Sequence, residues 1–360
     1  MQTPLCARLG LDVPIVQAPM AGGWTTPELV AAVCNAGGLG MLAAARLSLE
    51  QLRGQIDAVR RLTTRPFGVN FLLAAPGAAP ADASGMQRVL DAGRAQRGLA
   101  PGSAALALPP SALAAQFELA CDARVPVVGF AMGDPAPLVP RAQAAGAFVI
   151  AMATSVAEAR RLEAGGVDAI VAQGSEAGGH RSCLEPPGDT APPLIGTMAL
   201  LPQVVDAVRV PVIATGGLMD GRGVLAALVL GAQAAQLGTR FLLALEAGTF
   251  PAYRQRLIEA DETDTVVTRA LTGWPARAVR NSVVRAVEAA GEPPLGWPYQ
   301  ALAAEDLYRA AIISGDADWA PLLAGQGLRL ARGVSSAAEI VAALKAEIAA
   351  GAERLGAGFR

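Results

Sequence analysis

Short apolar segments that alternate with stretches of helical length constrain the fold of this chain more than any other feature of its sequence. The segments are apolar throughout instead of at every second position, which is typical of parallel strands buried on both faces. Eight such segments over roughly 245 residues predict an α/β fold, a (β/α)8 TIM barrel, with a doubly wound sheet as the alternative. The predicted strands are Pro14–Ala18, Gly38–Leu42, Phe67–Leu72, Val125–Phe130, Ala147–Met152, Asp168–Gln173, Val210–Thr215 and Ala234–Gly238.

Local start signals support helices between these strands. Pro27 follows Thr26 at the start of the first helix, where the N–H that proline lacks would have no partner anyway. Ser48 and Gln51 have the spacing of a capping box before the second helix. The other start signals are Ser111, Pro135, Ser155, Thr197 and Asp220.

After the eighth strand the regular alternation stops, and the sequence predicts a smaller, mainly helical lid domain. We assign residues 1–247 to the barrel, 248–320 to the lid and 321–360 to a C-terminal segment that returns to the barrel as a helix. The long connection Ala74–Pro110 is expected to form a loop and a short helix over the barrel mouth. Elements predicted further on are helices at Thr249–Ala260, Ala276–Ala290, Ala301–Ser314 and Ser335–Arg360, and an extended piece at Thr265–Thr268.

Composition argues against several classes of function. The formal net charge is -2, Lys345 is the only lysine and no basic patch stands out, so nucleic-acid binding has no electrostatic support. No segment has the apolar length of a signal-peptide core or a membrane span, and the four cysteines are scattered like reduced thiols. Cys183 and His180 alone do not make a metal site. We therefore expect a cytoplasmic protein without bound metal or membrane contact.

Glycines follow the last two predicted strands. Active sites of such barrels lie where the strands end, and the loops after strands seven and eight frequently bind phosphate. Gly216 and Gly217 occupy the first of these loops, and Gly238 and Thr239 the second. Glycine lets backbone N–H groups approach phosphate oxygens, and Thr239 adds a hydroxyl. A tight turn is the alternative for the Gly-Gly pair alone, but the two loops together predict a cofactor with a phosphate tail.

Uncharged amides lie near the ends of three predicted strands. Asn70, Gln173 and Gln236 could hydrogen-bond the carbonyl and N–H edge of a flavin ring. Pro19 and Met20, after the first strand, would pack on the apolar face of such a ring. A core amide bonded to backbone is the alternative for Asn70.

The single histidine lies in a glycine-flanked loop just after the sixth strand. An unperturbed histidine titrates at a pKa of about 6.5, so His180 could gain or lose a proton near neutrality. The glycines Gly174, Gly178 and Gly179 leave room for a ligand to approach the backbone closely. A turn histidine with a satisfied hydrogen bond is the alternative, but the neighbouring strand ends favour a site.

Several motifs occur in a fixed order along the chain. They are QAPMAGG at 17–23, GGLGML at 37–42, PFGVNFL at 66–72, AQGSEAGGHR at 172–181, ATGGLMDGRG at 214–223 and AQLGTRFLLALEAG at 235–248, with GWPYQ at 296–300 and AGQGLRLAR at 324–332. This set resembles the nitronate monooxygenases, FMN-dependent flavoproteins formerly called 2-nitropropane dioxygenases.

The resemblance implies a barrel with FMN at its C-terminal mouth. His180 would act there either as a base toward nitroalkanes or as an imidazolium that binds the nitronate oxygens. Met20 and Tyr299 would contact the substrate, and Arg181 or Arg240 could supply positive charge. The residues implied to hold FMN are Ala18, Pro19, Met20, Asn70, Gln173, Gly178, Gly179, Gly216, Gly217, Gln236, Leu237, Gly238 and Thr239.

The implied reaction is the oxidation of alkyl nitronates, such as propionate 3-nitronate, by O2 to a carbonyl compound and nitrite, without NAD(P)H. Two other functions fit parts of the pattern. A flavin-dependent NAD(P)H reductase of the enoyl-acyl-carrier-protein or quinone reductase kind shares the barrel and the Gly-Gly-His loop. A barrel that only binds a phosphorylated metabolite would use the glycine loops alone. The natural nitronate and the oligomeric state stay open.

Overall fold

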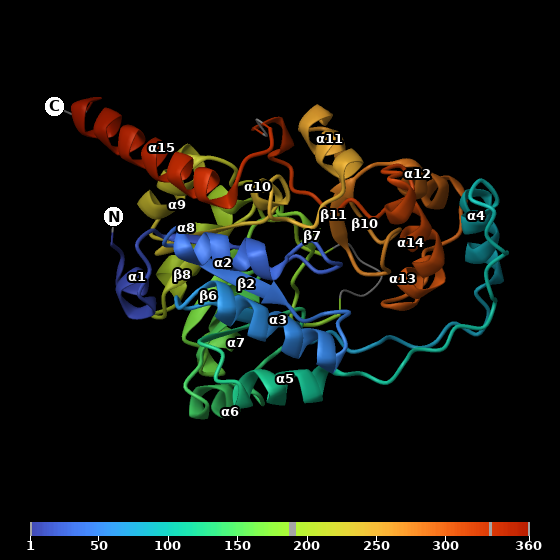
Figure 1. Cartoon of the computed structure of the whole chain (residues 1–360), viewed down its shortest axis with the longest axis horizontal. Coiled ribbons are helices and arrows are strands. Elements are labelled where there is room, and N and C mark those ends of the chain that lie inside the picture. Colours follow the sequence, from blue (N-terminus) through green and yellow to red (C-terminus); the bar gives the residue numbers. More distant parts are fainter. Residues whose placement is uncertain (1, 187–191, 331–332, 359–360) are drawn as a thin grey trace.

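The chain folds around a closed barrel of eight parallel strands (Figure 1), in a computed structural model that describes residues 2–186, 192–330 and 333–358. The barrel closes because β9 pairs with β1, Gln236 lying opposite Val16. The predicted TIM barrel is confirmed, and no predicted strand boundary differs from the structure by more than two residues. The strands are β1 Ile15–Gln17, β2 Leu39–Ala43, β3 Gly68–Leu72, β4 Val127–Ala131, β5 Phe148–Ala153, β6 Ala169–Gln173, β8 Val212–Thr215 and β9 Ala234–Leu237.

The barrel interior is filled by aliphatic side chains and closed at its N-terminal end. Met41, Val127 and Ile213 belong to one buried cluster inside the barrel. Leu5 and Cys6 of α1 (Pro4–Leu9) join the same cluster, so α1 covers the bottom of the barrel. Because side chains block this end, a ligand can enter only where the strands end.

Helices surround the sheet, and the predicted start signals cap several of them. Thr26 accepts the backbone N–H of Leu29, and Ser48 and Gln51 form the complete capping box. Such caps satisfy N–H groups that have no partner within the helix. The surrounding helices are α2 Pro27–Asn35, α3 Leu49–Leu62, α5 Leu113–Asp122, α6 Val139–Ala144, α7 Val156–Ala164, α8 Thr197–Ala207 and α9 Gly221–Val229, and the short α10 Thr239–Leu242 follows β9.

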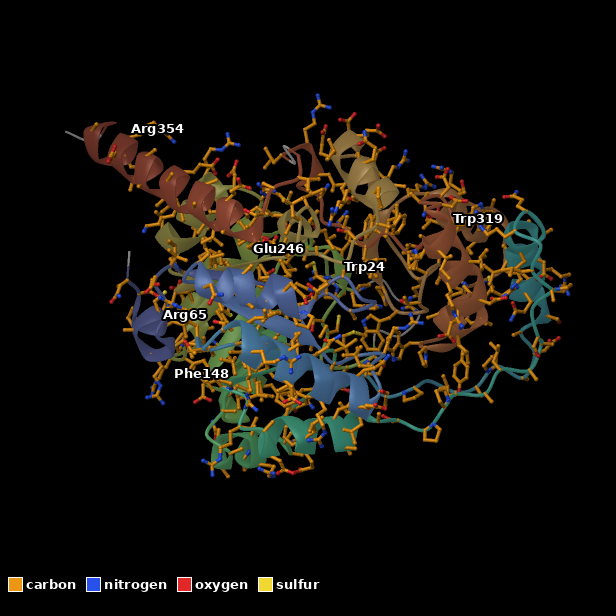
Figure 2. The ribbon with its side chains drawn as sticks, in the orientation of Figure 1. Trp24, Arg65, Phe148, Glu246, Trp319 and Arg354 are labelled. Carbon is orange, nitrogen blue, oxygen red and sulfur yellow. The ribbon has the colours of Figure 1, made fainter. Side chains whose placement is uncertain are left out.

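A second hydrophobic core lies beyond the barrel mouth. It includes Trp24 after β1 and Trp319 at its far side, and Figure 2 shows how far apart these two side chains lie. We still propose, as the sequence suggested, that the chain divides after residue 247 and after residue 320. The elements of this part are α11 Pro251–Glu259, β10 Thr265–Thr268, β11 Ala276–Val279, α12 Ser282–Ala289, α13 Tyr299–Ala303 and α14 Glu305–Ser314, and η1 Leu328–Leu330 follows.

A small antiparallel sheet joins this second part to the barrel. β11 pairs with β10 on one side and with β7 (Gly179–His180) on the other. The prediction of one helix over Ala276–Ala290 is therefore wrong at its start. Its first residues are held in a strand by partners far away in the sequence, and the helix begins only after Asn281, whose side chain accepts the N–H of Val284.

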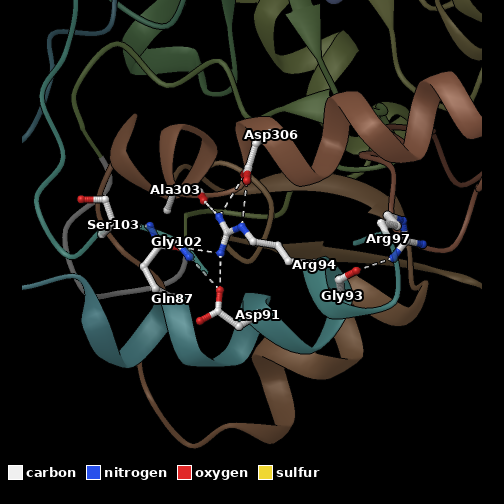
Figure 3. Close-up of polar contacts among 9 residues, drawn as sticks. All are labelled: Gln87, Asp91, Gly93, Arg94, Arg97, Gly102, Ser103, Ala303 and Asp306. Carbon is white, nitrogen blue, oxygen red and sulfur yellow. Dashed lines mark hydrogen bonds and ion pairs between the residues drawn. The ribbon is translucent and has the colours of Figure 1, made fainter. Parts of the chain in front are cut away.

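The long connection after β3 contains α4 (Ser84–Ala95), which packs on α12 and α14 at the far side of the lid (Figure 1). The expectation of a helix over the barrel mouth is thus wrong, although the later residues Leu108–Pro110 do line the mouth. Figure 3 shows what fixes α4. Arg94, 2 % exposed, donates to both carboxylate oxygens of Asp306 at 2.9 and 3.0 Å and to Asp91 at 2.8 Å.

The last helix, α15 (Ala337–Gly358), packs on α9, one of the helices around the barrel. Ile340, Leu344 and Ile348 pack in one cluster with Val224 of α9, and Lys345 lies on the exposed face. Residues 359 and 360, which the prediction included, lie outside the described residues. Within the described ranges, no helix has the length and apolar character needed to cross a membrane.

Candidate active site

A cavity of about 800 Å³ opens at the C-terminal ends of the barrel strands. It extends from the strand ends to the lid, where Trp297 and Thr272 line it. Most of the residues that the sequence proposed for the site lie around this one cavity. They are Ala18, Pro19, Met20, Asn70, Gln173, Gly178, Gly179, His180, Gly216, Gly217, Gln236, Gly238 and Thr239.

The two glycine loops lie side by side because β8 and β9 are neighbours in the barrel. Gly216 and Gly217 have φ angles of 120° and 70°, in a region that glycine enters without strain. The Thr239 hydroxyl accepts the backbone N–H of Gly325 at 2.9 Å, which brings the segment before η1 to the same place. Gly325 and Gly327 both line the cavity, and strand-end reasoning missed them; the AGQG motif was their only sequence signal.

The three amides differ in their partners. Gln173 is satisfied by the histidine loop, since it donates to the carbonyl of His180 and accepts from the N–H of Ser182, both at 2.9 Å. Asn70 and Gln236 are 8 % and 3 % exposed, and their side-chain amides have no hydrogen-bond partner in the described part of the chain. Both residues line the cavity, and their amide atoms are not among the fully enclosed atoms that lack a partner, so they are open to the cavity. These two therefore suit a ligand with a polar ring edge, which is the requirement of a flavin.

His180 lies where the barrel meets the lid. Its Nε2 is 2.9 Å from the Thr272 hydroxyl, and its ring meets Trp297 edge-on with centroids 5.1 Å apart. Pairing with Ala276 fixes its backbone in β7. Burial lowers the pKa of His180 from 6.5 to about 4, so the imidazole is neutral at pH 7.

Two arginines hold the loop that carries His180. Arg181, which is fully buried, donates to the carbonyls of Gly174 at 2.6 Å and Gln173 at 3.1 Å. Arg277 donates to the carbonyl of the next residue, Ser175, at 2.9 Å. Burial lowers the pKa of both guanidinium groups. Arg181 thus supports the loop, and the structure does not bring it to the cavity as a charge for the substrate.

The structure also leaves Tyr299, Leu237 and Arg240 out of the cavity lining. Tyr299 is 7 % exposed in the first turn of α13, and Pro298 just before it and Ala301 two positions after it line the cavity instead. The Leu237 side chain belongs to the core outside the barrel, although its carbonyl accepts the N–H of Ala18 at 2.9 Å.

Sequence reasoning missed three other lining residues, Trp297, Thr272 and Met132. The first two come from the lid, whose approach to the strand ends no local pattern reveals. Met132 follows β4 with a φ of 59°, a left-handed conformation that is unusual for a residue with a side chain. Strain of this kind is concentrated at functional sites.

Comparison with known proteins agrees with this geometry. The family model described as nitronate monooxygenase matches residues 5–347. A probable nitronate monooxygenase of Staphylococcus aureus (strain Newman) is 40% identical over 337 residues, which cover 91% of this chain and 92% of the relative. A protein of the same description from Staphylococcus saprophyticus is 37% identical over 345 residues, 93% of this chain and 95% of the relative.

Solved structures show the same relationship. A nitroalkane oxidase from Streptomyces ansochromogenes superposes with a TM-score of 0.89 at 38% identity, covering 98% of this chain and 99% of the other. FabK from Thermotoga maritima superposes with a TM-score of 0.80 at 31% identity, and the match covers 100% of both chains. The fold and these relatives define a flavin-dependent barrel oxidoreductase. Within that class, the chain belongs to the nitronate monooxygenase family.

Proposed function

We propose that the protein is an FMN-dependent enzyme that oxidises alkyl nitronates with O2 to a carbonyl compound and nitrite, without NAD(P)H. The observation that carries this is the placement of His180 at the cavity, between Thr272 and Trp297. The same cavity holds the paired glycine loops, which suit a phosphate, and the unpartnered amides of Asn70 and Gln236.

The residues around the cavity would divide the tasks of cofactor binding between them. Gly216, Gly217, Gly238 and Thr239 would bind the phosphate of FMN. Asn70 and Gln236 would hydrogen-bond its ring edge, and Ala18, Pro19 and Met20 would lie along the ring. Gln173, Gly178 and Gly179 would hold the histidine loop against it. When bound, FMN would accept an electron from the nitronate and pass it on to O2.

The hydrogen bonds of Thr272 indicate how His180 would act. The Thr272 hydroxyl donates to the carbonyl of Trp274 at 3.3 Å, so its oxygen, which also accepts the N–H of Trp274 at 3.4 Å, is left to accept from Nε2–H of His180. This arrangement leaves Nδ1 unprotonated and without a partner in the described ranges. We therefore assign His180 the role of a neutral base that takes a proton from a nitroalkane, and a nitronate arrives without that proton.

Anaerobic mixing tests the reaction class. A nitronate should change the flavin spectrum and NADH should leave it unchanged. Bleaching by NADH would instead favour the NAD(P)H reductase, and a purified protein without flavin that resists reconstitution would favour a metabolite-binding barrel.

The variant His180→Asn tests the role of the histidine. Neutral nitroalkanes should lose roughly 10²–10⁴-fold in kcat/KM, because their proton has no acceptor. Preformed nitronates should lose much less, because they need no base and a neutral His180 whose Nε2–H is bonded to Thr272 has no N–H to donate to them. Flavin content should stay unchanged. Equal losses for both substrate forms would reject the base role.

A further inference from the structure

Part of the cavity lies beyond the residues that FMN would contact. Three segments that are distant in the sequence line this part, which we call the outer channel. They are the loop after β2, the end of the long connection after β3, and the start of α13 with the first residue of α14. The lining residues are Ala45, Arg46, Leu47 and Ser48, then Leu108 to Leu113, then Trp297, Pro298, Ala301, Leu302 and Glu305.

The outer channel begins at His180 and leads away from the barrel. Trp297 contacts the imidazole edge-on, and the cavity-lining positions continue along α13 to Glu305. At a helical rise of 1.5 Å per residue, the α13 part of this path, Tyr299–Ala303, spans about 6 Å. Glu305 contacts Arg46 across the channel at 3.3 Å, which marks its outer end.

The part of the channel wall formed by the loop after β2 is held in a fixed conformation. The buried amide of Gln116 donates to the carbonyls of Ala44 at 3.2 Å and Leu47 at 2.6 Å. Between them Arg46 has a φ of 68°, a left-handed conformation that costs energy for a residue with a Cβ. The loop thus presents Leu47 to the channel in a fixed position.

The outer channel is mostly apolar between its two ends, and its uncharged polar residues are Ser48, Gln51, Ser111 and Gln116. Leucine, proline and alanine side chains form most of both walls. Among the described residues that line the cavity, Arg46 is the only arginine and Glu305 the only carboxylate, and they pair with each other at the solvent-exposed end. A carboxylate on the substrate would therefore find no cation in the channel that lacks an acidic partner.

We propose that the outer channel binds the hydrocarbon chain of the substrate, so that this enzyme prefers nitronates with a long unbranched alkyl chain to short or carboxylate-bearing ones. This inference rests on the proposed function, because it places the nitronate group at His180 and the chain along α13. Burial of apolar surface supplies the preference, and it should grow with each methylene until the chain reaches the Arg46–Glu305 pair.

The first experiment compares nitronates of 1-nitroalkanes from two to six carbons with propionate 3-nitronate, using nitrite release by the flavin-loaded enzyme. Each added methylene should raise kcat/KM about fourfold. Propionate 3-nitronate should be poorer than the butyl compound. Equal kcat/KM across the series, or a preference for propionate 3-nitronate, would overturn the proposal.

Two variants narrow the channel from two of its three lining segments, Ala301→Phe and Leu108→Phe. Both should lose the gain with chain length and keep the activity on the two-carbon nitronate. Ile313→Phe is the matched control, because Ile313 is 80% exposed on α14 and does not line the cavity. Flavin content and melting temperature report whether each variant folds; Leu108 lies on a partly exposed segment that should tolerate the change.

Calorimetric titration with uncharged 1-nitroalkanes separates this inference from the proposed function. Affinity for the flavin-loaded enzyme should rise with chain length, and it should not rise for Ala301→Phe. If nitronates of every length fail to react while binding still tightens with length, the proposed function is wrong and the channel stands. If binding is independent of length, the channel proposal is wrong whatever the turnover.

Discussion

A measurement of the pKa of His180 would show how completely the lid and the barrel enclose its side chain. It is the only histidine in the chain, and burial lowers its pKa from 6.5 to about 4. The unfolded chain therefore binds this proton more tightly than the native protein, so the native state loses stability as the pH falls from 6.5 toward 4. At about 1.4 kcal/mol per pH unit, the full difference is about 3 kcal/mol.

Urea unfolding of the wild type and His180→Asn, both saturated with FMN, measures this loss. Between pH 7 and pH 5 the wild type should lose about 1–2 kcal/mol more than the variant, the lower value applying if solvent in the cavity screens the ring. Acidic groups titrate in both proteins and cancel in the difference. Parallel stability curves would show that the imidazole has an ordinary pKa, and the argument that the lid and the barrel enclose it would be wrong.

Three further substitutions test the cofactor site, the terminal helix and the lid. Gly217→Asp should yield protein without flavin, and Gly217→Asn should retain the flavin. The two side chains match in shape, and only aspartate carries a charge that repels a phosphate. Equal flavin content of the two variants by absorbance would reject the phosphate site. Lys345→Ala should leave kcat and KM unchanged, since Lys345 is exposed on α15, and a large rise in KM would show that α15 reaches the site. Arg94→Met should lower the free energy of unfolding by about 1–3 kcal/mol, because it leaves Asp306 and Asp91 without their partner. The control Arg329→Met removes an exposed ion pair and should lower it by less than about 1 kcal/mol. Equal losses in the two variants would contradict the role of burial.

The barrel could be predicted because its information is local. The strands are almost entirely apolar, and helices with side-chain caps at Thr26, Ser48, Ser155 and Asp220 follow four of them, so the period and the start signals agree. For the segment Ala276–Val279, no period and no start signal point to the same kind of element. Its short apolar run suits a helix or a strand equally, and pairing with β10 and β7, far away in the chain, decides the outcome.

The residues of the candidate site also fall into two groups, those that local sequence predicts and those whose position depends on long-range packing. Residues at strand ends, such as Asn70 and Gly217, could be proposed because a parallel barrel brings all such ends together. Trp297 and Thr272 come from the lid, and their approach to the cavity depends on how it packs. The sequence favours Tyr299, but Trp297, two residues earlier and before α13 begins, lines the cavity instead, because the sequence alone does not reveal how this segment turns toward the site.

The position of His180 depends on the barrel and the lid at once. Its carbonyl accepts a hydrogen bond from Gln173 at the end of β6, while its backbone pairs with Ala276 of β11 and its ring contacts Trp297. The glycine-rich loop before it has few side chains of its own to pack. Two buried guanidinium groups hold this loop instead: Arg181 and, from the lid, Arg277 donate hydrogen bonds to three successive backbone carbonyls. Since Arg277 belongs to β11, a displacement of the lid would release both the loop and the histidine, so the geometry of the base and the closure of the cavity are set by the same contacts.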